Sequence, residues 1–269
     1  MKTPLRWAGS KKALLPTLRT FWNCGRGRYI EPFCGSACLF FDLEPDEAVL
    51  GDINSELIST YRTLASRPSN VMECVLRWKP TEQNYYKLRT LDPFSLSEVE
   101  LAARFLFLNR LCFNGIYRTN AAGKFNVPFG HPKSAVRFDT GVYLAASSLL
   151  KRATLVHGDF EEALADADTG DFVYLDPPYA VSSRRVFSEY RPEGFSEKDL
   201  KRLHALLHTL DGKGVKFVVS YADSAEGRRL VSDWNPKRVR TKRNIAGFAG
   251  HRRAAYEVLA SNLERGECL

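Results

Sequence analysis

The chain has 269 residues, 44% of them hydrophobic, and its 39 Lys and Arg residues outnumber 31 Asp and Glu residues, for a net charge of +8. This composition supplies enough apolar surface for a large core and argues against a disordered chain. No stretch reaches the roughly 18 consecutive apolar residues of a membrane span, and no apolar run near the N-terminus precedes a cleavage site, so we expect a cytoplasmic protein.

The basic charge is distributed unevenly. Residues 1–30, 101–138 and 234–256 contain no acidic residue. A basic surface can serve solubility alone, but three such windows in an otherwise mixed chain favour a polyanionic partner, with nucleic acid as the natural candidate.

The six cysteines form no Cys-x-x-Cys pair and no Cys/His array with zinc spacing, so we expect reduced thiols and no bound metal.

Short apolar or β-branched runs, with helical patterns between most of them, predict an α/β fold with parallel strands. In such sheets the ligand lies at the carboxyl ends of the strands. The residues that follow the runs, Glu31, Asp52, Asp159 and Asp176, are therefore candidates for the site. The runs are residues 29–31, 48–50, 154–156, 172–175, 215–219 and 255–260.

The strand rhythm disappears between residues 56 and 150, where the pattern is helical at 57–66, 70–78, 82–90 and 98–111. This predicts a helical insertion into a sheet domain formed by residues 1–55 and 151–269. Turn signals at Phe113-Asn114-Gly115 and Ala122-Gly123-Lys124 predict an exposed loop or hairpin at 113–130.

The first ligand-binding motif is the segment 31–40, a strand that breaks at Gly35 and runs into a helix. A small residue lets the backbone approach a ligand, and a helix start offers N–H groups. A dinucleotide fingerprint would need three glycines, so a tight turn without a ligand is an equally good interpretation. Asp52 ends the next strand, where it can accept both hydroxyls of a ribose or cap the following helix; its pairing with the Gly35 turn favours the ligand.

The second motif is Asp176-Pro177-Pro178-Tyr179. Two prolines remove two N–H groups, so the Asp176 carboxylate and the carbonyls present acceptors without a competing donor. Such a site suits an exocyclic amino group, whose lone pair is delocalised into its ring. Asp176 and the Pro177 carbonyl would pull the nitrogen toward tetrahedral geometry and direct it at a sulfonium methyl, while Tyr179 stacks on the base. An ordinary proline-rich turn is the alternative.

With these motifs the chain resembles the Dam family of N6-adenine DNA methyltransferases, in the order cofactor motif, target-recognition insert and catalytic motif. The resemblance implies a Rossmann-like methyltransferase sheet whose helical insertion ends in a β-hairpin. It also implies a monomer in solution that uses S-adenosylmethionine to methylate adenine in double-stranded DNA. The matching positions are 7–11, 31–40, 52–55, 108–115, 118, 120, 123, 125–130 and 176–179.

The resemblance also assigns cofactor-binding roles. Phe33 and Gly35 would line the methionine end of S-adenosylmethionine, and Asp52 would hold its ribose. Asp159 with Phe160 would lie against its adenine.

Two further residues, Trp7 and Lys11, would close the site near the methionine moiety and the target base. The chain departs from the family at two glycine positions. Ala37 replaces the second glycine of the turn, which must then tolerate a methyl group, and Ser10 replaces another.

A base within a duplex cannot reach such a pocket, so the adenine has to be flipped out of the helix. By resemblance, Phe113 with Asn114 would insert near the vacated position, although Phe113 could instead be a core aromatic at the end of a helix. Arg118 occupies the position that reads a guanine, which a guanidinium pairs bidentately through O6 and N7.

Three more residues match the family's DNA contacts. Asn120 and Pro128 lie in the same stretch, Pro128 being suited to a thymine methyl, and Arg6 could contact a guanine or a phosphate. These matches favour GATC or a close relative. His131 and Pro132 depart from the family pattern and leave the outer bases open.

Other functions would use some of the same residues. A cytosine-N4 or RNA-adenine methyltransferase would use the same amino-group chemistry, but the hairpin stretch matches the adenine DNA branch. A catalytically silent DNA-binding protein would not need the intact motif at 176–179. The sequence does not distinguish a restriction-system, regulatory or phage enzyme.

Overall fold

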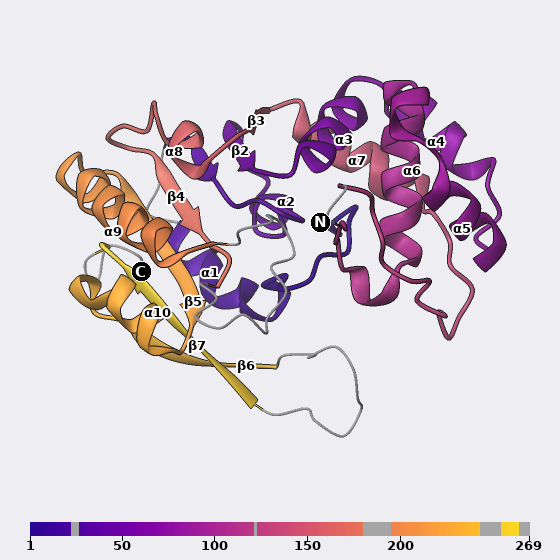
Figure 1. Ribbon diagram of the computed structural model, residues 1–269. Helices are drawn as coiled ribbons and strands as arrows, with labels where there is room; N and C mark the ends of the chain where they lie inside the picture. The colour runs from indigo at the N-terminus through magenta and orange to yellow at the C-terminus, as the bar shows by residue number, and fades with distance from the viewer. Residues whose placement is uncertain (23–26, 121–122, 180–194, 243–253, 264–269) are drawn as a thin grey trace.

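The computed structural model describes residues 1–22, 27–120, 123–179, 195–242 and 254–263. These residues form a sheet covered by helices, with a helical part at one end (Figure 1). The strands are β1 (Tyr29–Glu31), β2 (Ala48–Asp52), β3 (Ala153–His157), β4 (Phe172–Leu175), β5 (Lys216–Ala222), β6 (Lys237–Lys242) and β7 (Ala254–Ser261).

Within the described ranges the seven strands lie in the order β3-β2-β1-β4-β5-β7-β6. Neighbours from β3 to β5 are parallel, and β7 is antiparallel to both β5 and β6. This arrangement confirms the predicted Rossmann-like methyltransferase fold. The strand β6 is not among the predicted elements, because its basic sequence is that of a sheet edge and only its pairing with β7 makes it a strand.

The helices of the sheet part are η1 (Lys12–Leu14), α1 (Leu15–Trp22), α2 (Phe40–Leu43), α8 (Phe160–Ala163), α9 (Glu197–Gly212), α10 (Ala225–Leu230) and η4 (Ser232–Trp234). Side chains alternate between the two faces of the sheet, as the pleat requires. Tyr29 and Phe172 join the core on one face, whereas Ile30 and Val173 join the core under α9 on the other. The sheet is therefore covered on both faces.

The helical part contains α3 (Ser55–Ser66), α4 (Pro68–Leu76), α5 (Glu82–Thr90), η2 (Pro93–Ser95), α6 (Glu98–Leu111), η3 (Phe113–Gly115) and α7 (Thr140–Leu150). The helix α6 is buried along most of its length, with α3, α4 and α5 against it. The helix α7 is not among the predicted helices; it packs on α3 and α4. None of the helices in the described ranges combines the length and apolar character that a membrane crossing requires.

After α6 the chain forms two antiparallel arms. They pair at isolated bridges, Cys112 with Phe129 and Thr119 with Phe125, rather than as continuous strands. Arg104 lies in the acid-free window 101–138, but it is buried and donates to the carbonyls of Leu88 and Arg89. It holds the end of α5 and contributes no charge to a surface for nucleic acid.

Candidate active site

The candidate residues meet at one edge of the sheet because of its strand order. The chain proceeds from β1 outward to β2 and β3 on one side, while β4 and β5 lie on the other. The boundary between β1 and β4 is the switch point at which α/β sheets bind ligands. The segment 31–40 leaves β1 at this point, and Asp176 leaves β4 beside it.

The turn after β1 depends on Gly35. Its φ is +45°, and a Cβ there would lie 2.7 Å from the Cδ1 and Nε1 atoms of Trp7, so only glycine fits beneath the indole. The Trp7 ring in turn stacks on Tyr117 at a centroid distance of 6.1 Å. The Tyr61 hydroxyl donates to the Gly35 carbonyl at 2.8 Å. The helical part therefore shapes the turn through Trp7 and Tyr61.

Asp52, at the end of β2, connects this turn to α3. Its Oδ2 accepts the N–H of Gly35 at 2.9 Å, and its Oδ1 accepts the N–H of Asn54 at 2.9 Å. Burial raises the pKa of Asp52, although these backbone donors oppose the shift. The N-cap of α3 is Asn54, which accepts the N–H of Leu57, so the interpretation of Asp52 as the cap is wrong. Each Asp52 oxygen retains a lone pair that can accept a hydroxyl.

Beyond β1 and β3, aromatic rings form an apolar wall. The ring of Phe33 lies 5.4 Å from that of Phe160 and 5.9 Å from that of Phe195, centroid to centroid. The guanidinium of Arg202 lies 4.9 Å from the Phe160 centroid. The wall offers a flat group such as a purine an apolar surface next to Asp52.

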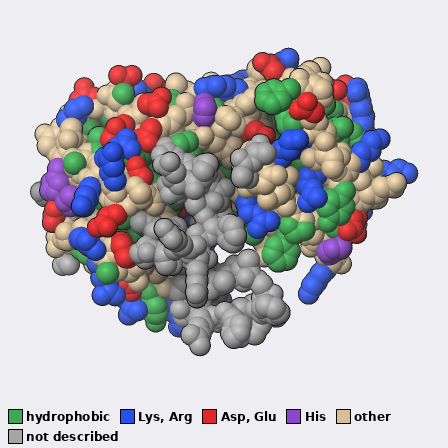
Figure 2. Space-filling model, in the orientation of Figure 1, with side chains coloured by type: hydrophobic (Ala, Val, Ile, Leu, Met, Phe, Trp, Pro, Cys, Tyr) green, Lys and Arg blue, Asp and Glu red, His purple; other side chains and the backbone are tan. Residues whose placement is uncertain are grey.

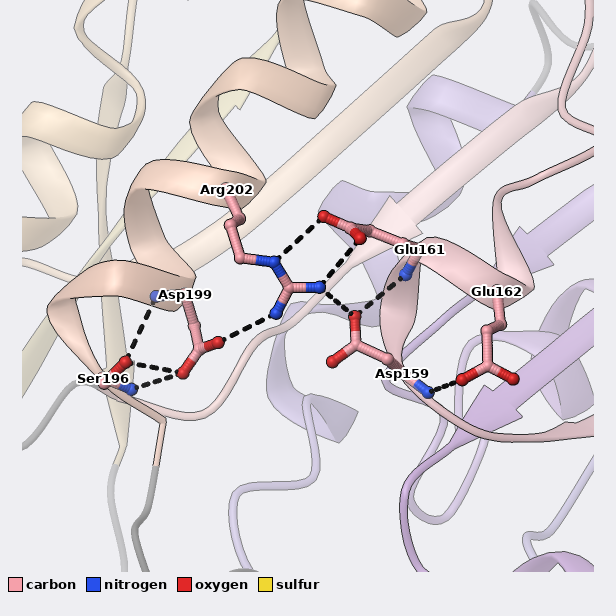
Figure 3. Close-up of polar contacts among 6 residues, drawn as sticks. All are labelled: Asp159, Glu161, Glu162, Ser196, Asp199 and Arg202. Carbon is pink, nitrogen blue, oxygen red and sulfur yellow. Dashed lines mark hydrogen bonds and ion pairs between the residues drawn. The ribbon is translucent and has the colours of Figure 1, made fainter.

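Asp159 has a structural task that the sequence did not reveal (Figure 3). It is the N-cap of α8, where its Oδ1 accepts the N–H of Glu161. The same oxygen lies 2.9 Å from Nη2 of Arg202, which also lies 2.8 Å from Glu161 Oε2. Through its Nη1, Arg202 contacts Asp199 in its own helix at 3.0 Å. Asp159 therefore anchors α8 to α9.

On the β4 side, the central group is Lys11. Its Nζ lies 2.9 Å from Asp176 Oδ1, 3.3 Å from the Tyr179 hydroxyl and 3.5 Å from Glu257 Oε1. Lys11 is only 6% exposed and Glu257 only 3%. Burial disfavours the ammonium, but Asp176, Tyr179 and Glu257 outweigh it and raise the pKa of Lys11, so that the side chain stays charged.

A second contact holds Asp176 from β5. The Ser220 hydroxyl donates to Asp176 Oδ1 at 3.1 Å and lies 2.9 Å from the Tyr174 hydroxyl. Pro177 is buried, and Tyr179 is exposed and packs edge-on against Tyr221 with centroids 5.1 Å apart.

Sequence reasoning missed Ser220 and Glu257. For Glu257 a signal existed: it is the acidic residue in the otherwise apolar run 255–260, and a buried carboxylate in a strand requires a partner. The partner is Lys11, which the family resemblance places near the methionine moiety and the target base.

The proposed DNA-contacting residues fall into two groups. In the first group, Asn109 holds the backbone of Arg6 through two hydrogen bonds. Asn109 Oδ1 accepts the N–H of Arg6 at 2.9 Å, and Asn109 Nδ2 donates to the Arg6 carbonyl at 2.7 Å. Gly115 packs against Arg6 so closely that a Cβ would lie 2.7 Å from Arg6 Cβ. The N-terminal segment and the end of α6 therefore share one surface. Phe113 is 37% exposed there, so the core interpretation of this ring is wrong, and Asn114 has a φ of +54°.

The second group lies on the antiparallel arms. Arg118 donates through Nε to Asn126 Oδ1 at 2.8 Å. The Asn120 side chain accepts the N–H of Lys124 at 3.0 Å and so links the two arms. Pro128 is exposed. Figure 2 shows one face of the molecule, with Lys and Arg side chains on the surface to the right of the grey atoms.

The fold and this edge of the sheet define a Rossmann-like methyltransferase. Comparison with known proteins is more specific: the model of the family D12 class N6 adenine-specific DNA methyltransferase matches residues 7–245. The chain belongs to this family.

Three relatives illustrate its range. The type II methyltransferase M1.LlaDCHI of Lactococcus lactis subsp. cremoris is 35% identical over 96% of this chain and 94% of its own length. The retron Ec67 DNA adenine methylase of Escherichia coli is 32% identical over 97% and 91%. The type II methyltransferase M.MjaIII of Methanocaldococcus jannaschii is 31% identical over 97% and 99%.

Proposed function

We propose that this protein transfers a methyl group from S-adenosylmethionine to the N6 amino group of adenine at a specific site in double-stranded DNA. The observation that carries the proposal is the position of Asp176. This carboxylate lies at the switch point of the sheet, beside the turn at Gly35 and before two prolines without N–H groups. The relatives named as DNA adenine methylases support the same reaction.

The β1–β2–β3 side has groups that fit S-adenosylmethionine. Asp52 offers acceptors for ribose hydroxyls, Phe33 and Phe160 offer an apolar wall for adenine, and the turn at Gly35 exposes backbone for the amino-acid end. When bound, this cofactor supplies an electrophilic methyl group. Trp7 covers the turn, and Asp159 supports the adenine side by fixing α8.

The β4–β5–β7 side prepares the amino group. Asp176 and the Pro177 carbonyl accept its two hydrogens, which localises the nitrogen lone pair, and Tyr179 stacks on the base. Lys11 then gives up its contact with Asp176 and keeps Glu257. Because Lys11 stays protonated, it cannot accept the proton that the methylated nitrogen releases. Asp176 is the carboxylate placed to take it.

Asp176→Asn tests this assignment. The amide removes the negative charge, so labelled methyl transfer should fall by about 100-fold or more, while the dissociation constants for cofactor and duplex DNA change little. A matched control is Asp46→Asn, an exposed Asp that contacts Arg152 on the surface. Retention of more than about a tenth of wild-type turnover would remove Asp176 from the reaction.

For DNA, we assign residues 56–150, including the arms at 113–130, to target recognition and residues 1–55 and 151–269 to catalysis. The target adenine is flipped out, and Phe113 with Asn114 takes the vacated position. The molecule acts as a monomer in the cytoplasm. Because exposed Lys and Arg neutralise several phosphates, duplex affinity should fall steeply with added salt.

Sequence choice rests on Arg118, which we propose reads a guanine of GATC or a related site. Arg6, Asn120 and Pro128 supply the neighbouring contacts. Arg118→Ala should cost about 1 to 3 kcal/mol on the cognate site and relax preference at one base pair. Lys133→Ala, at an exposed position, is the control for a phosphate contact and should weaken binding equally on all sequences. A uniform loss in Arg118→Ala would show that Arg118 contacts only phosphate.

The recognition sequence can be read directly. The protein is expressed in a host that lacks adenine methylation, and methylated positions are mapped by single-molecule sequencing. Methylated adenines in GATC support the assignment, whereas another motif replaces it.

A further inference from the structure

Three ligating side chains converge on the surface formed by α9 and η4, outside the proposed active site. His204 and His208 are four positions apart on α9, and Asp233 lies in η4. One ligand atom from each lies within 4.8 Å of the others. The proposed methyl transfer uses none of these residues.

In this cluster two hydrogen-bond acceptors, His204 Nε2 and Asp233 Oδ2, face each other. His208 Nε2 lies 2.9 Å and His204 Nε2 lies 3.5 Å from the same atom, Asp233 Oδ2. His204 Nδ1 lies 3.1 Å from the Leu230 carbonyl, which can only accept, so Nδ1 carries a proton. In the neutral ring, Nε2 of His204 then presents a lone pair to a carboxylate oxygen. A metal ion bound between these two acceptors would satisfy both of them.

We propose that His204, His208 and Asp233 bind one divalent transition-metal ion, with zinc as the ion that the ligand set fits best. Zinc takes imidazole and carboxylate ligands at about 2.0 to 2.2 Å in a tetrahedron, which separates neighbouring ligand atoms by about 3.3 Å. Two histidines at i and i+4 on a helix are a spacing that zinc sites use.

Two further features of the cluster fit this ion. The Leu230 carbonyl orients His204 in the way that outer partners orient metal-bound imidazoles. The side chains are 35%, 53% and 46% exposed, so water can supply the fourth ligand.

Ring packing alone does not account for this geometry. The rings of His204 and His208 lie 5.7 and 4.8 Å from that of Trp234, which explains their position on α9. It does not explain why both Nε2 atoms point at one oxygen. The His-x-x-x-His spacing of His204 and His208 contains no cysteine, so it lies outside the Cys-x-x-Cys and Cys/His patterns on which the expectation of no bound metal rests.

The ion would be structural rather than catalytic. Arg202, two positions before His204, projects from a different side of α9 and pairs with Asp159 (Figure 3). The metal would connect α9 to η4 on the other side and so stabilise the packing of Trp234. Methyl transfer should therefore be unchanged by a chelator.

Isothermal titration of Zn²⁺ into the chelator-treated full chain tests the proposal. We expect one ion per chain, and weaker binding in His208→Ala and Asp233→Asn. Loss of an outer partner costs about 10- to 100-fold in metal affinity, and loss of a ligand should cost at least as much. The matched control is His157→Ala, an exposed histidine of β3, which should bind zinc as the wild type does.

Fluorescence provides a second readout. Cu²⁺ at this site should quench Trp234, and Trp234→Phe should lose that quenched component while it still binds Zn²⁺. Absence of zinc binding, or equal binding by His208→Ala and wild type, overturns the proposal. Because zinc binding is measured without DNA or methyl donor, its failure is distinct from failure of the proposed function.

Discussion

The two sides of the β1–β4 boundary hold their carboxylates by different means. On the β2 side, Asp52 is held by the backbone N–H groups of Gly35 and Asn54. On the β4 side, Asp176 is held by side chains, above all by the buried ammonium of Lys11.

This difference separates a rigid half from an exchangeable half. Backbone donors cannot leave, so Asp52 is preorganised for a ligand. A side-chain cation can give up one contact, and Glu257 lets Lys11 do so without becoming an uncompensated buried charge. The first half therefore holds a fixed acceptor, and the second holds an acceptor whose ion pair can be replaced.

Removal of the Lys11 ammonium, which Asp176 and Glu257 share, should have the largest effect on stability. Lys11→Met removes the buried cation that pairs with both Asp176 and Glu257, so the free energy of unfolding should fall by about 3 to 5 kcal/mol, measured by urea titration at neutral pH. Adding Glu257→Gln to this variant should recover part of the loss. The control Lys12→Met changes the neighbouring exposed lysine and should have little effect. If Lys11→Met were as stable as wild type, the shared-cation account would be wrong.

On the rigid half, Asp52→Ala should raise the dissociation constant of S-adenosylmethionine by the equivalent of about 1 to 3 kcal/mol, because acceptors for the ribose are lost. Calorimetric titration measures it. Asn54→Ala perturbs the same loop by removing the α3 cap and should reduce stability with little effect on cofactor affinity. An unchanged dissociation constant in Asp52→Ala would exclude Asp52 from the cofactor site.

Glu31 is the last residue of β1, between the two halves, and it should make the free energy of unfolding depend on pH. It accepts the Tyr29 hydroxyl at 2.8 Å, and burial raises its pKa well above the ordinary value. The folded chain then binds a proton that the unfolded chain has released, so stability falls as pH rises from the unfolded pKa, about 4.3, toward the folded pKa.

Glu31→Gln removes this titration and keeps an acceptor for Tyr29. The variant should lose less unfolding free energy than wild type between about pH 5 and about pH 8, by about 1.4 kcal/mol for each pH unit of this window in which the folded carboxyl is protonated and the unfolded one is ionised. Denaturant titrations at both pH values measure the difference. Parallel pH profiles would show that Glu31 is ionised in the folded state.

The smallest effect on stability is expected in the turn between β1 and α2. Ala37 has a φ of +47°, a conformation that costs an L-residue about 1 to 2 kcal/mol. Ala37→Gly relieves this strain but loses a buried methyl group, so we expect a net change below about 0.5 kcal/mol. Ala48→Gly, at a buried position in β2, gains no such relief and should cost about 1 to 2 kcal/mol more. Thermal unfolding compares the two, and equal losses would show that the turn is unstrained.

Local patterns predicted much of this fold because they report burial along one segment. The predicted runs 29–31, 48–50, 154–156 and 172–175 lie within β1 to β4, and the helical pattern at 98–111 coincides with α6. The same patterns placed Asp52 and Asp176 at strand ends, where a parallel sheet collects its ligands.

Contacts between distant segments were decided only by the tertiary structure. Sequence periodicity indicates which face of a segment is buried, but not which segment covers it. The ion pairs of Lys11 require η1 to meet the edge where β4, β5 and β7 lie side by side, and the pairing of Asp159 with Arg202 requires α8 to lie on α9. The sequence by itself therefore determined that carboxylates stand at the ends of two parallel strands, Asp52 at β2 and Asp176 after β4, because that position depends on residue type and local spacing. The order of the strands decided which cation each carboxylate faces, because charges separated along the chain interact only where folding brings them within a few ångströms.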